Sequence, residues 1–422
     1  MRRIYTIIMY MLVPVILLRL LWKSRRSPAY GQRISERFTL NTSLCEPVDV
    51  WVHAVSMGEV VAVTPLVERM LAKNLRVLIT TMTPTGSQQV LARFKSKVVH
   101  QYVPYDLPVC VRRFFKRFQP RVGIIMETEL WPNLIHQAKL AHIPLVLINA
   151  RLSDHAFVYY HKLRYFFAKI LSELTWIGAQ SEPDAGRYLA LGALSSQVTM
   201  VGNMKFDVSM PPATTSALEQ LKQTWGAHRP VWIAASTHED EEAQLLSQLS
   251  RIKAAIPDLL LLIAPRRPER FQTVYAWVTQ QGWKTGLRSQ PHTLGMDNDV
   301  IILDSMGELM SFYGLSDYAF VGGSLVPVGG HNVLEPIAMQ VPVLCGPYMQ
   351  NSKSICEELL RHGALHQSRS AENIADQLIA LYQDPAKRAQ QIACASSVLH
   401  ANRGTVDRYW HRIEEIMMGK EM

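Results

Sequence analysis

The hydrophobic pattern divides the chain into one long apolar segment and a body of short alternating elements. Residues 4–22 are almost continuously apolar, interrupted only by Thr6, Pro14 and Arg19. From Val48 onward, β-rich runs such as VDVWVHAV and LRVLITTM alternate with amphipathic or polar stretches, and a second series begins at RPVWIAAS. Such alternation predicts parallel strands joined by helical crossovers. We therefore expect an α/β fold with two facing, doubly wound, Rossmann-like domains.

The join between the two series lies at residues 208–216, VSMPPATTS, which are rich in Pro, Ser and Thr and have no periodicity. This composition predicts a linker. We expect an anchor at residues 1–25, a first domain at 26–208 and a second domain at 209–422 that includes the closing helical segment TVDRYWHRIEEIMM. Open parallel sheets bind ligands at the carboxyl ends of their strands, so the residues that follow each strand are the candidates for a site.

The apolar segment at residues 4–22 has roughly the 20-residue length that spans a bilayer. It lacks a small-residue cleavage site, which disfavours a removed signal peptide. More basic residues follow the segment than precede it, so the positive-inside rule predicts a cytoplasmic body. The following cluster comprises Arg19, Lys23, Arg25, Arg26, Arg33 and Arg37. A helix lying in the membrane interface and a buried helix of the soluble fold remain alternatives.

The composition excludes few classes of binding partner. The formal net charge of +9 favours anionic partners without distinguishing phospholipid, nucleotide and nucleic acid. Basic residues are not interleaved with aromatic ones as in nucleic-acid-binding modules, so we expect no nucleic-acid partner. The five cysteines are widely spread and lack metal-ligand spacing, which predicts neither a disulfide nor a zinc site.

Three segments of the first domain carry candidate chemistry. In HAVSMGE, Glu59 begins a helix, where its carboxylate is expected to stay ionised and accept a proton, although such residues commonly only complement the helix dipole. The run IMETELWPNL places Glu127 and Glu129 directly after a strand, either in a solvated cleft or in structural ion pairs. Lys205 in GNMKFDV offers a positive charge to an anion, a weak signal by itself.

The second domain carries signals of a nucleotide site. Arg266 follows a strand in IAPRRPERF, where a guanidinium can hold a phosphate. Residues 304–347 contain two glycine pairs and then a helix start at residues 332–335, where backbone amides suit a phosphate and Glu335 suits ribose hydroxyls. Glycine pairs alone mark turns more often than ligands. The combination is typical of the nucleotide-sugar side of a GT-B glycosyltransferase.

Many segments occur together in one order: HAVSMGE, TTMTPTGS, YVPYDLP, METELWPNL, INARLS, GNMKFD, WIAASTHEDEE, PRRPERF, MGELMSFYG, FVGGSLV and GGHNVLEP. In this respect the chain resembles the 3-deoxy-D-manno-octulosonic acid (Kdo) transferases of lipopolysaccharide synthesis. The resemblance implies a GT-B enzyme that transfers Kdo from CMP-Kdo, with inversion, to the tetraacyl lipid A precursor (lipid IVA). It also implies a position on the cytoplasmic face of the inner membrane, where phospholipid and the acceptor's phosphates and acyl chains meet the anchor and its basic residues.

Carried onto this chain, the resemblance implies that Glu59 is the general base and that Glu127, Glu129 and Lys205 lie near the reacting centre. It implies no metal and no cofactor, because cationic side chains and helix amides can stabilise the departing phosphate. The implied CMP-Kdo site consists of Pro265, Arg266, Met306, Gly307, Glu308, Asn332, Val333, Leu334 and Glu335.

Two rival interpretations stay open at this point. One is a GT-B transferase that uses a UDP-sugar and a lipid-linked acceptor. The other is a nonenzymatic membrane scaffold that retains the fold, against which the presence of Glu59 counts. The number of Kdo units added, the separate roles of Glu127 and Glu129, the acyl chains that the acceptor needs and the oligomeric state are equally open.

Overall fold

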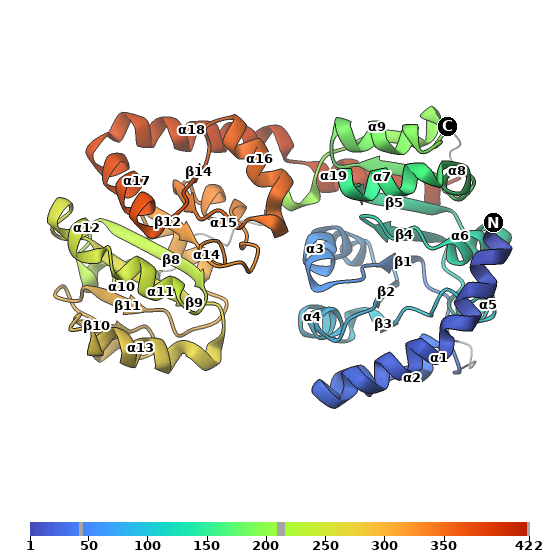
Figure 1. Cartoon of the computed structure of the whole chain (residues 1–422), viewed down its shortest axis with the longest axis horizontal. Coiled ribbons are helices and arrows are strands. Elements are labelled where there is room, and N and C mark those ends of the chain that lie inside the picture. The colour runs from blue at the N-terminus through green and yellow to red at the C-terminus, as the bar shows by residue number, and fades with distance from the viewer. Residues whose placement is uncertain (42–44, 209–215, 420–422) are drawn as a thin grey trace. The chain divides into compact units, whose positions relative to one another are not determined.

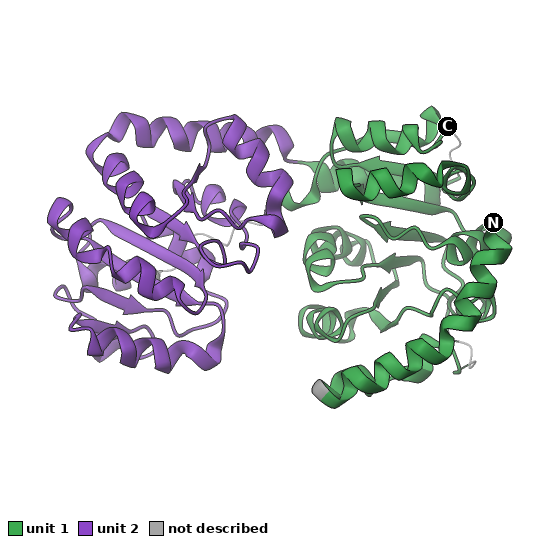
Figure 2. Cartoon of the chain, in the orientation of Figure 1, with its two compact units in different colours: residues 1–207, 404–422 green, residues 208–403 purple. Residues whose placement is uncertain are grey.

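The computed structural model describes residues 1–41, 45–208 and 216–419 of the chain (Figure 1). The chain forms two compact units (Figure 2): the first comprises Met1–Asp207 with Gly404–Met422, and the second comprises Val208–Arg403. Most of the predicted linker at 208–216 lies outside the described residues. Each unit is an α/β layer structure built on its own parallel sheet, as the alternating pattern predicts.

Unit 1 is built on a seven-stranded parallel sheet with the order β3-β2-β1-β4-β5-β6-β7. The strands are β1 (Val50–His53), β2 (Val77–Thr81), β3 (Val99–Tyr102), β4 (Val122–Met126), β5 (Leu145–Ala150), β6 (Trp176–Ala179) and β7 (Val198–Met200). The α-helices are α1 (Arg2–Arg26), α2 (Ile34–Arg37), α3 (Met57–Ala72), α4 (Pro84–Phe94), α5 (Pro108–Phe118), α6 (Pro132–Leu140), α7 (Asp154–Lys162), α8 (Arg164–Leu171), α9 (Glu182–Ala190) and α19 (Thr405–Met417).

Unit 2 is built on a second seven-stranded parallel sheet, with the order β10-β11-β9-β8-β12-β13-β14. Its strands are β8 (Val231–Thr237), β9 (Leu260–Pro265), β10 (Thr285–Leu287), β11 (Val300–Ile302), β12 (Tyr318–Val321), β13 (Val343–Cys345) and β14 (His366–Gln367). Its α-helices are α10 (Ser216–Trp225), α11 (Glu241–Leu246), α12 (Leu249–Ala255), α13 (Phe271–Gln280), α14 (Leu309–Gly314), α15 (Leu334–Ala338), α16 (Lys353–Arg361), α17 (Ala371–Gln383) and α18 (Pro385–Asn402).

The central strands of both sheets are covered on both faces, which explains their apolar sequences. All residues of β1, β4, β9 and β12 are buried. Strands of this kind have nearly continuous runs of Val, Ile and Leu in their sequences, because helices pack on both faces of the sheet. Each sheet has a switch point in its strand order, between β1 and β4 in unit 1 and between β8 and β12 in unit 2. Open α/β sheets bind their ligands at such points.

The N-terminal helix α1 lies along unit 1 with one face on the protein. Thr6 Oγ1 donates to Asn133 Oδ1 over 2.8 Å, and Leu20 is buried. Most of its other apolar side chains are exposed, among them Ile4, Ile7, Met11, Val15, Leu18 and Leu21. It is the one helix of the described chain that is long and apolar enough to cross a membrane, with a mean hydropathy of 2.2 in that window. The alternative of a buried core helix is therefore excluded.

The closing helix α19 belongs to unit 1, which corrects its assignment to the second domain. Both carboxylate oxygens of Asp207 accept backbone N–H groups at the start of this last segment, from Gly404 and Val406. Further along the helix, the Tyr409 hydroxyl accepts from Asn149 N over 3.0 Å and donates to Gly178 O over 2.9 Å. The helix itself was predicted correctly, and its buried apolar side chains complete the core of the first sheet rather than that of the second.

Replacing Tyr409 by Phe is expected to lower the free energy of unfolding of unit 1 by about 1–3 kcal/mol, because Asn149 N–H loses its buried acceptor. Urea unfolding followed by tryptophan fluorescence measures the change. Tyr159→Phe, at an exposed position of the same unit, is the matched control and should change little. If the two variants were equally stable, the Tyr409 hydroxyl would not contribute to holding α19 on unit 1.

Candidate active site

Glu59 is held by the turn between β1 and α3. Ser56 caps the helix, and its hydroxyl donates to Glu59 Oε1 over 2.9 Å. Glu59 Oε2 accepts the Val55 N–H over 2.8 Å. This reciprocal arrangement resembles a capping box, so the residue does serve the helix start. Its carboxyl group is nevertheless directed at the carboxyl end of the sheet beside the switch point, where a ligand is expected.

Burial controls the protonation of Glu59. Only 8% of its surface is exposed, and this burial raises the pKa of the carboxyl group to about 7, against the lowering effect of the Val55 N–H. The negative charges of Glu127 and Glu129 raise the pKa further, whereas the Ser56 hydroxyl opposes them. The expectation that the helix N-terminus keeps this group ionised at neutrality is thus corrected. A base with a pKa near the working pH is well suited to accept a proton.

Glu127 lies between two cationic side chains at the end of β4. Its Oε1 is 3.5 Å from Lys205 Nζ, and its Oε2 is 3.6 Å from Arg151 Nε. The backbone of Glu127 has φ of 55°, a left-handed conformation that costs energy in a residue with a side chain. Of the two alternatives left open by the sequence, a solvated cleft or an ion pair, the structure shows the ion pair for Glu127. Arg151, in the INARLS segment, had no role assigned from the sequence.

Glu129 has a different set of contacts from Glu127. Its Oε2 accepts the indole N–H of Trp131 over 2.7 Å, and burial raises the pKa of its carboxyl group. The Trp131 ring meets the buried ring of His53 edge to face, with centroids 5.3 Å apart. Glu59, Glu127, Glu129 and Lys205, all predicted from the sequence, are therefore gathered at one edge of the unit 1 sheet.

Five of the nine residues predicted for the donor site line a pocket at the carboxyl end of the unit 2 sheet, whereas residues 332–335 do not. Pro265 and Arg266 reach it from the end of β9, and Met306, Gly307 and Glu308 reach it from the loop after β11. The left-handed φ of 86° at Gly307 explains why a glycine is needed in this loop. These five residues, predicted from two distant segments, thus form one surface.

The carboxylate of Glu308 forms hydrogen bonds with other residues of unit 2. Its Oε1 accepts from Arg288 Nη2 over 3.1 Å, and its Oε2 accepts the Ser305 hydroxyl. Arg288 lies between β10 and β11 and gave no sequence signal, because the pairing joins positions 20 residues apart. The glutamate therefore shapes the loop beside the pocket through this ion pair.

The residues at the start of α15 divide into two kinds. Val333 and Leu334 are fully buried, so their side chains belong to the core and only their backbone atoms remain for a ligand. Asn332 and Glu335 are joined by a 3.1 Å hydrogen bond. The pKa of Glu335 is raised by burial, and Asn332 and the positive charge of Arg266 oppose the shift. Arg266 therefore lies close enough to connect this segment electrostatically with the pocket.

Glu241 is an organising residue that no motif revealed. It is fully buried at the start of α11. Its Oε1 accepts from the backbone N–H groups of Ser324 and Leu325, and its Oε2 accepts from those of Gly323 and His238. All the acceptor bonds are between 2.7 and 3.0 Å long. One carboxylate thus fixes the loops that follow β8 and β12 at the switch point.

A histidine pair lies beside these loops. Nε2 of His238 and Nε2 of His331 are 2.8 Å apart, and the two rings are stacked within 3° of parallel. Burial and the charge of Arg266 lower the pKa of His331 to about 4, so its ring is neutral near pH 7. One imidazole then donates to the other. Both histidines lie in segments quoted for the resemblance, WIAASTHEDEE and GGHNVLEP, but the sequence did not indicate this contact.

Each of the two units matches a known protein family model. Residues 32–208 match the family model described as 3-deoxy-D-manno-octulosonic-acid transferase, and residues 233–397 match the model for glycosyl transferases group 1. A 3-deoxy-D-manno-octulosonic acid transferase of Haemophilus influenzae is 39% identical over 96% of this chain and 96% of its own. The protein with the same description from Bordetella pertussis is 32% identical over 98% of this chain and 99% of its own.

Solved structures with low sequence identity share the fold. A glycosyltransferase from Rickettsia africae, 13% identical, aligns over 89% of this chain and 100% of its own with a TM-score of 0.56. A protein from Listeria monocytogenes described as a UDP-N-acetylglucosamine 2-epimerase, 14% identical, aligns over 89% of this chain and 98% of its own with a TM-score of 0.57. The two likenesses show the GT-B type of fold and nothing about substrate.

Proposed function

The chain belongs to the Kdo transferase family and is a Kdo glycosyltransferase, and from this premise we propose that its donor is CMP-Kdo and its acceptor the tetraacyl lipid A precursor. The observation that carries the proposal is the setting of Glu59, a buried carboxyl group with a pKa of about 7 at the switch point of the unit 1 sheet. A base of this kind suits an acceptor that reacts through a hydroxyl group.

In the proposed reaction, Glu59 removes the proton from the acceptor hydroxyl while its oxygen attacks the anomeric carbon of Kdo. The bond between that carbon and the CMP phosphate breaks, and CMP leaves with the electron pair. Attack from the face opposite the leaving group inverts the anomeric centre. Lys205 and Arg151, which Glu127 holds, supply positive charge near the base, and Glu129 positions Trp131.

The donor side of the proposal rests on the pocket of unit 2. Arg266 lines it, and its backbone N–H donates to Thr237 O over 2.9 Å, which fixes the start of the loop. A guanidinium there can hold the phosphate of CMP and stabilise its charge as it departs. We propose on this basis that the chemical step uses neither a metal ion nor a cofactor.

Replacing Arg266 by Gln is expected to lower kcat/KM for CMP-Kdo by about 10–100-fold, the magnitude of one charge-assisted phosphate contact. Steady-state kinetics with the donor varied measures the effect. Arg267→Gln is the matched control, because Arg267 is the adjacent arginine, exposed and outside the pocket. Equal losses in the two variants would argue for general surface charge and against a phosphate contact at Arg266.

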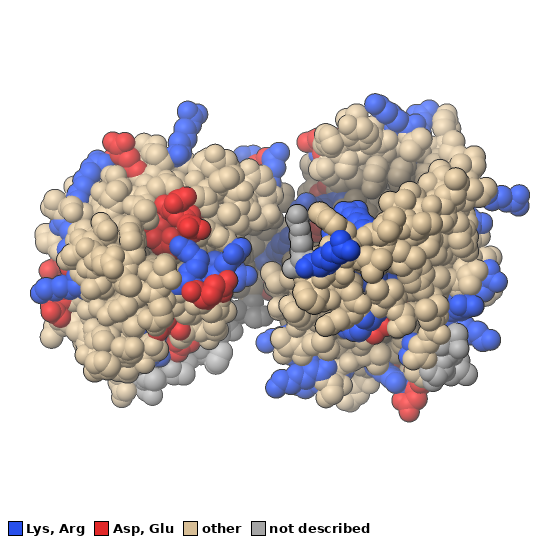
Figure 3. Space-filling view, turned by 60° about the horizontal axis from the view of Figure 1, so that its bottom comes forward, with Lys and Arg blue, Asp and Glu red and all other residues tan. Residues whose placement is uncertain are grey.

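We propose that the enzyme works on the cytoplasmic face of the inner membrane, anchored by α1. Many apolar side chains of α1 are exposed, and Figure 3 shows a broad area without charged residues on unit 1 with Lys and Arg side chains around its edge. Apolar side chains beside basic ones suit the boundary between acyl chains and anionic headgroups.

The proposal is tested by incubating the detergent-solubilised protein with CMP-Kdo and the lipid A precursor, and following CMP release together with the mass of the acceptor. A mass gain of one or more Kdo units supports the donor and the acceptor and counts the units transferred. A protein that is inert with CMP-Kdo but consumes a UDP-sugar would overturn the donor assignment.

A further inference from the structure

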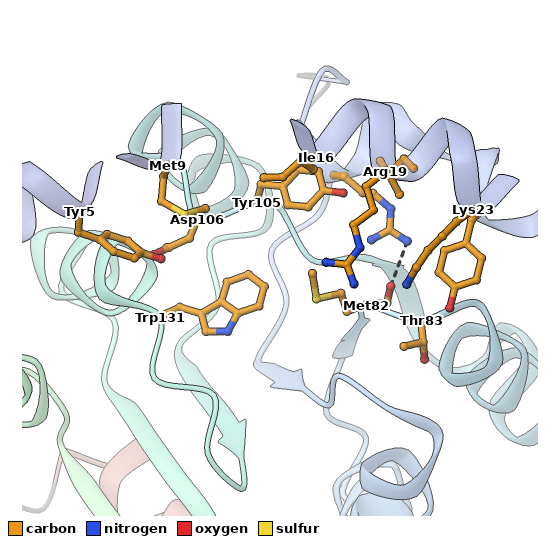
Figure 4. A pocket seen from close by; sticks show the side chains of 13 residues that line it. Tyr5, Met9, Ile16, Arg19, Lys23, Met82, Thr83, Tyr105, Asp106 and Trp131 are labelled. Carbon is orange, nitrogen blue, oxygen red and sulfur yellow. Dashed lines mark hydrogen bonds between the residues drawn. The ribbon is translucent and has the colours of Figure 1, made fainter. Parts of the chain in front are cut away.

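A pocket of about 360 Å³ lies between α1 and the carboxyl end of the unit 1 sheet (Figure 4). The helix forms one wall, and the loops after β2, β3 and β4 form the others, contributing Met82 and Thr83, Tyr105 and Asp106, and Trp131. Figure 4 shows Arg19 and Lys23 reaching from α1 toward Met82 and Thr83. None of the proposed chemistry of Glu59 requires a cavity at this place.

The wall formed by α1 is largely apolar. Met9, Ile16 and Leu20 line the pocket from one face of the helix. Ile7, Met11 and Leu18, on other faces of the helix, are exposed. The pocket is therefore bounded on one side by the same element that offers apolar surface to a membrane, which gives an acyl chain a continuous apolar path along the helix.

The end of the pocket near Lys23 is cationic rather than apolar. Arg37 is only 2% exposed, and its Nη2 donates to Met82 O over 3.0 Å. Its Nε is buried without a hydrogen-bond partner, and no carboxylate among the described residues forms an ion pair with it. The guanidinium lies over the Tyr102 ring, 4.0 Å from its centroid, and this contact offsets part of the cost of burial. The buried charge still lacks a carboxylate partner among the described residues, so the group suits an anionic ligand.

The acidic residue of the pocket does not neutralise these cations. Asp106 is the single acidic side chain that lines the pocket among the described residues. Its two carboxylate oxygens accept the backbone N–H groups of Asn133 and Leu134 at the start of α6. Arg19 and Lys23 add two more positive charges, so the pocket combines three cations with an apolar wall.

Residues that line the pocket contact the residues of the reacting centre in unit 1. Met82 N and Thr83 Oγ1 both donate to Val55 O, and Val55 N donates to Glu59. On the other side, Trp131 donates to Glu129 over 2.7 Å. A molecule seated in the pocket is thus separated from both carboxylates by single residues.

We propose that this pocket binds a phosphate group of the acylated acceptor, held by Arg37, Arg19 and Lys23, with an acyl chain along the inner face of α1. The inference rests on the proposed function, since the acceptor named there carries both groups. It makes α1 a wall of the acceptor site in addition to an anchor. The same chemistry is offered by an anionic phospholipid headgroup, and the experiment has to separate the two.

The test measures KM separately for acceptor and donor in detergent, with the acceptor either phosphorylated or enzymatically dephosphorylated. Arg37→Gln and the double variant Arg19→Gln/Lys23→Gln are expected to raise the acceptor KM by about tenfold or more, the loss of at least one charge-assisted contact. The donor KM should not change. The double variant guards against misfolding of the Arg37 variant, because Arg19 is exposed and Lys23 is only half-buried.

Dephosphorylation should weaken the wild type and leave both variants nearly unaffected, since they have already lost the contact. Arg25→Gln, an exposed charge on the same helix outside the pocket, is the matched control and should behave as wild type. An equal response of wild type and variants to dephosphorylation would overturn the proposal. So would an unchanged acceptor KM combined with weaker binding of the variants to phosphatidylglycerol vesicles, which would assign the pocket to a phospholipid.

Direct binding distinguishes failure of this inference from failure of the proposed function. If the wild type transfers no Kdo, the proposed function fails, and the affinity for the phosphorylated acceptor is measured alone. Tighter binding of the phosphorylated than the dephosphorylated form, abolished by Arg37→Gln, would still support the pocket. Equal binding of the two forms would overturn it.

Discussion

Replacement of Glu59 by Gln lowers kcat by about 10²–10⁴-fold, the contribution typical of a positioned general base. The amide cannot accept the proton of the acceptor hydroxyl, but its oxygen can still accept the bond from Val55 N or Ser56 Oγ. Kdo transfer by the purified variant measures the loss. Glu68→Gln, on the same helix and partly exposed in an ion pair with Arg93, is the control and should retain activity.

The pH dependence gives a second readout of the same residue. Because the pKa of Glu59 is about 7, kcat/KM of the wild type should rise with pH, by about tenfold per unit below 7, and level off above it. The Gln variant should lack this limb. A Gln variant with full activity, or one that keeps the same limb, would show that another group is the base.

The sign of the pKa shift also separates lost catalysis from lost folding. The folded protein holds the Glu59 proton more tightly than the unfolded chain, so this carboxyl group's contribution to stability falls as the pH rises from about 4.5 to about 7. Above pH 7 the ionised carboxylate is the unfavourable form in its buried position. Removing the charge therefore does not oppose folding at pH 8, where the activity should be compared.

Replacement of Glu241 by Gln is expected to lower the free energy of unfolding of unit 2 by about 2–6 kcal/mol. The carboxylate accepts four backbone N–H groups, and an amide leaves part of this set facing its own NH₂ group, at about 1–3 kcal/mol for each buried donor left unpaired. The midpoint of thermal unfolding, followed by circular dichroism, should fall accordingly.

Glu239→Gln is the matched control for this prediction, because Glu239 is the exposed acid two positions earlier in the same loop. The Glu241 variant should also raise the KM for CMP-Kdo, since the loops that it holds flank the donor pocket. An unchanged unfolding midpoint together with an unchanged donor KM would contradict the organising role of Glu241. A stable variant with a raised donor KM would restrict that role to the ligand loops.

Residues at strand ends could be predicted from the sequence, whereas contacts between residues far apart in the sequence could not. The candidates Glu59, Glu127 and Arg266 could be named because each follows a strand, and strand ends can be recognised from the local apolar run. Their roles in the reaction remain predictions. Arg288, Glu241 and the pairing of His238 with His331 could not be found in this way, because each depends on a contact between separate loops.

The sequence by itself determined the two parallel α/β units, the apolar helix at residues 4–22 and the strand-end positions of the candidate site, since these follow from periodicity over a few residues. Tertiary structure alone decided that α19 completes unit 1, because an apolar helix face does not specify which sheet covers it. It also decided that burial outweighs the local hydrogen bonds at Glu59 and that the buried Arg37 has no carboxylate partner among the described residues, because desolvation and pairing depend on neighbours that folding brings together.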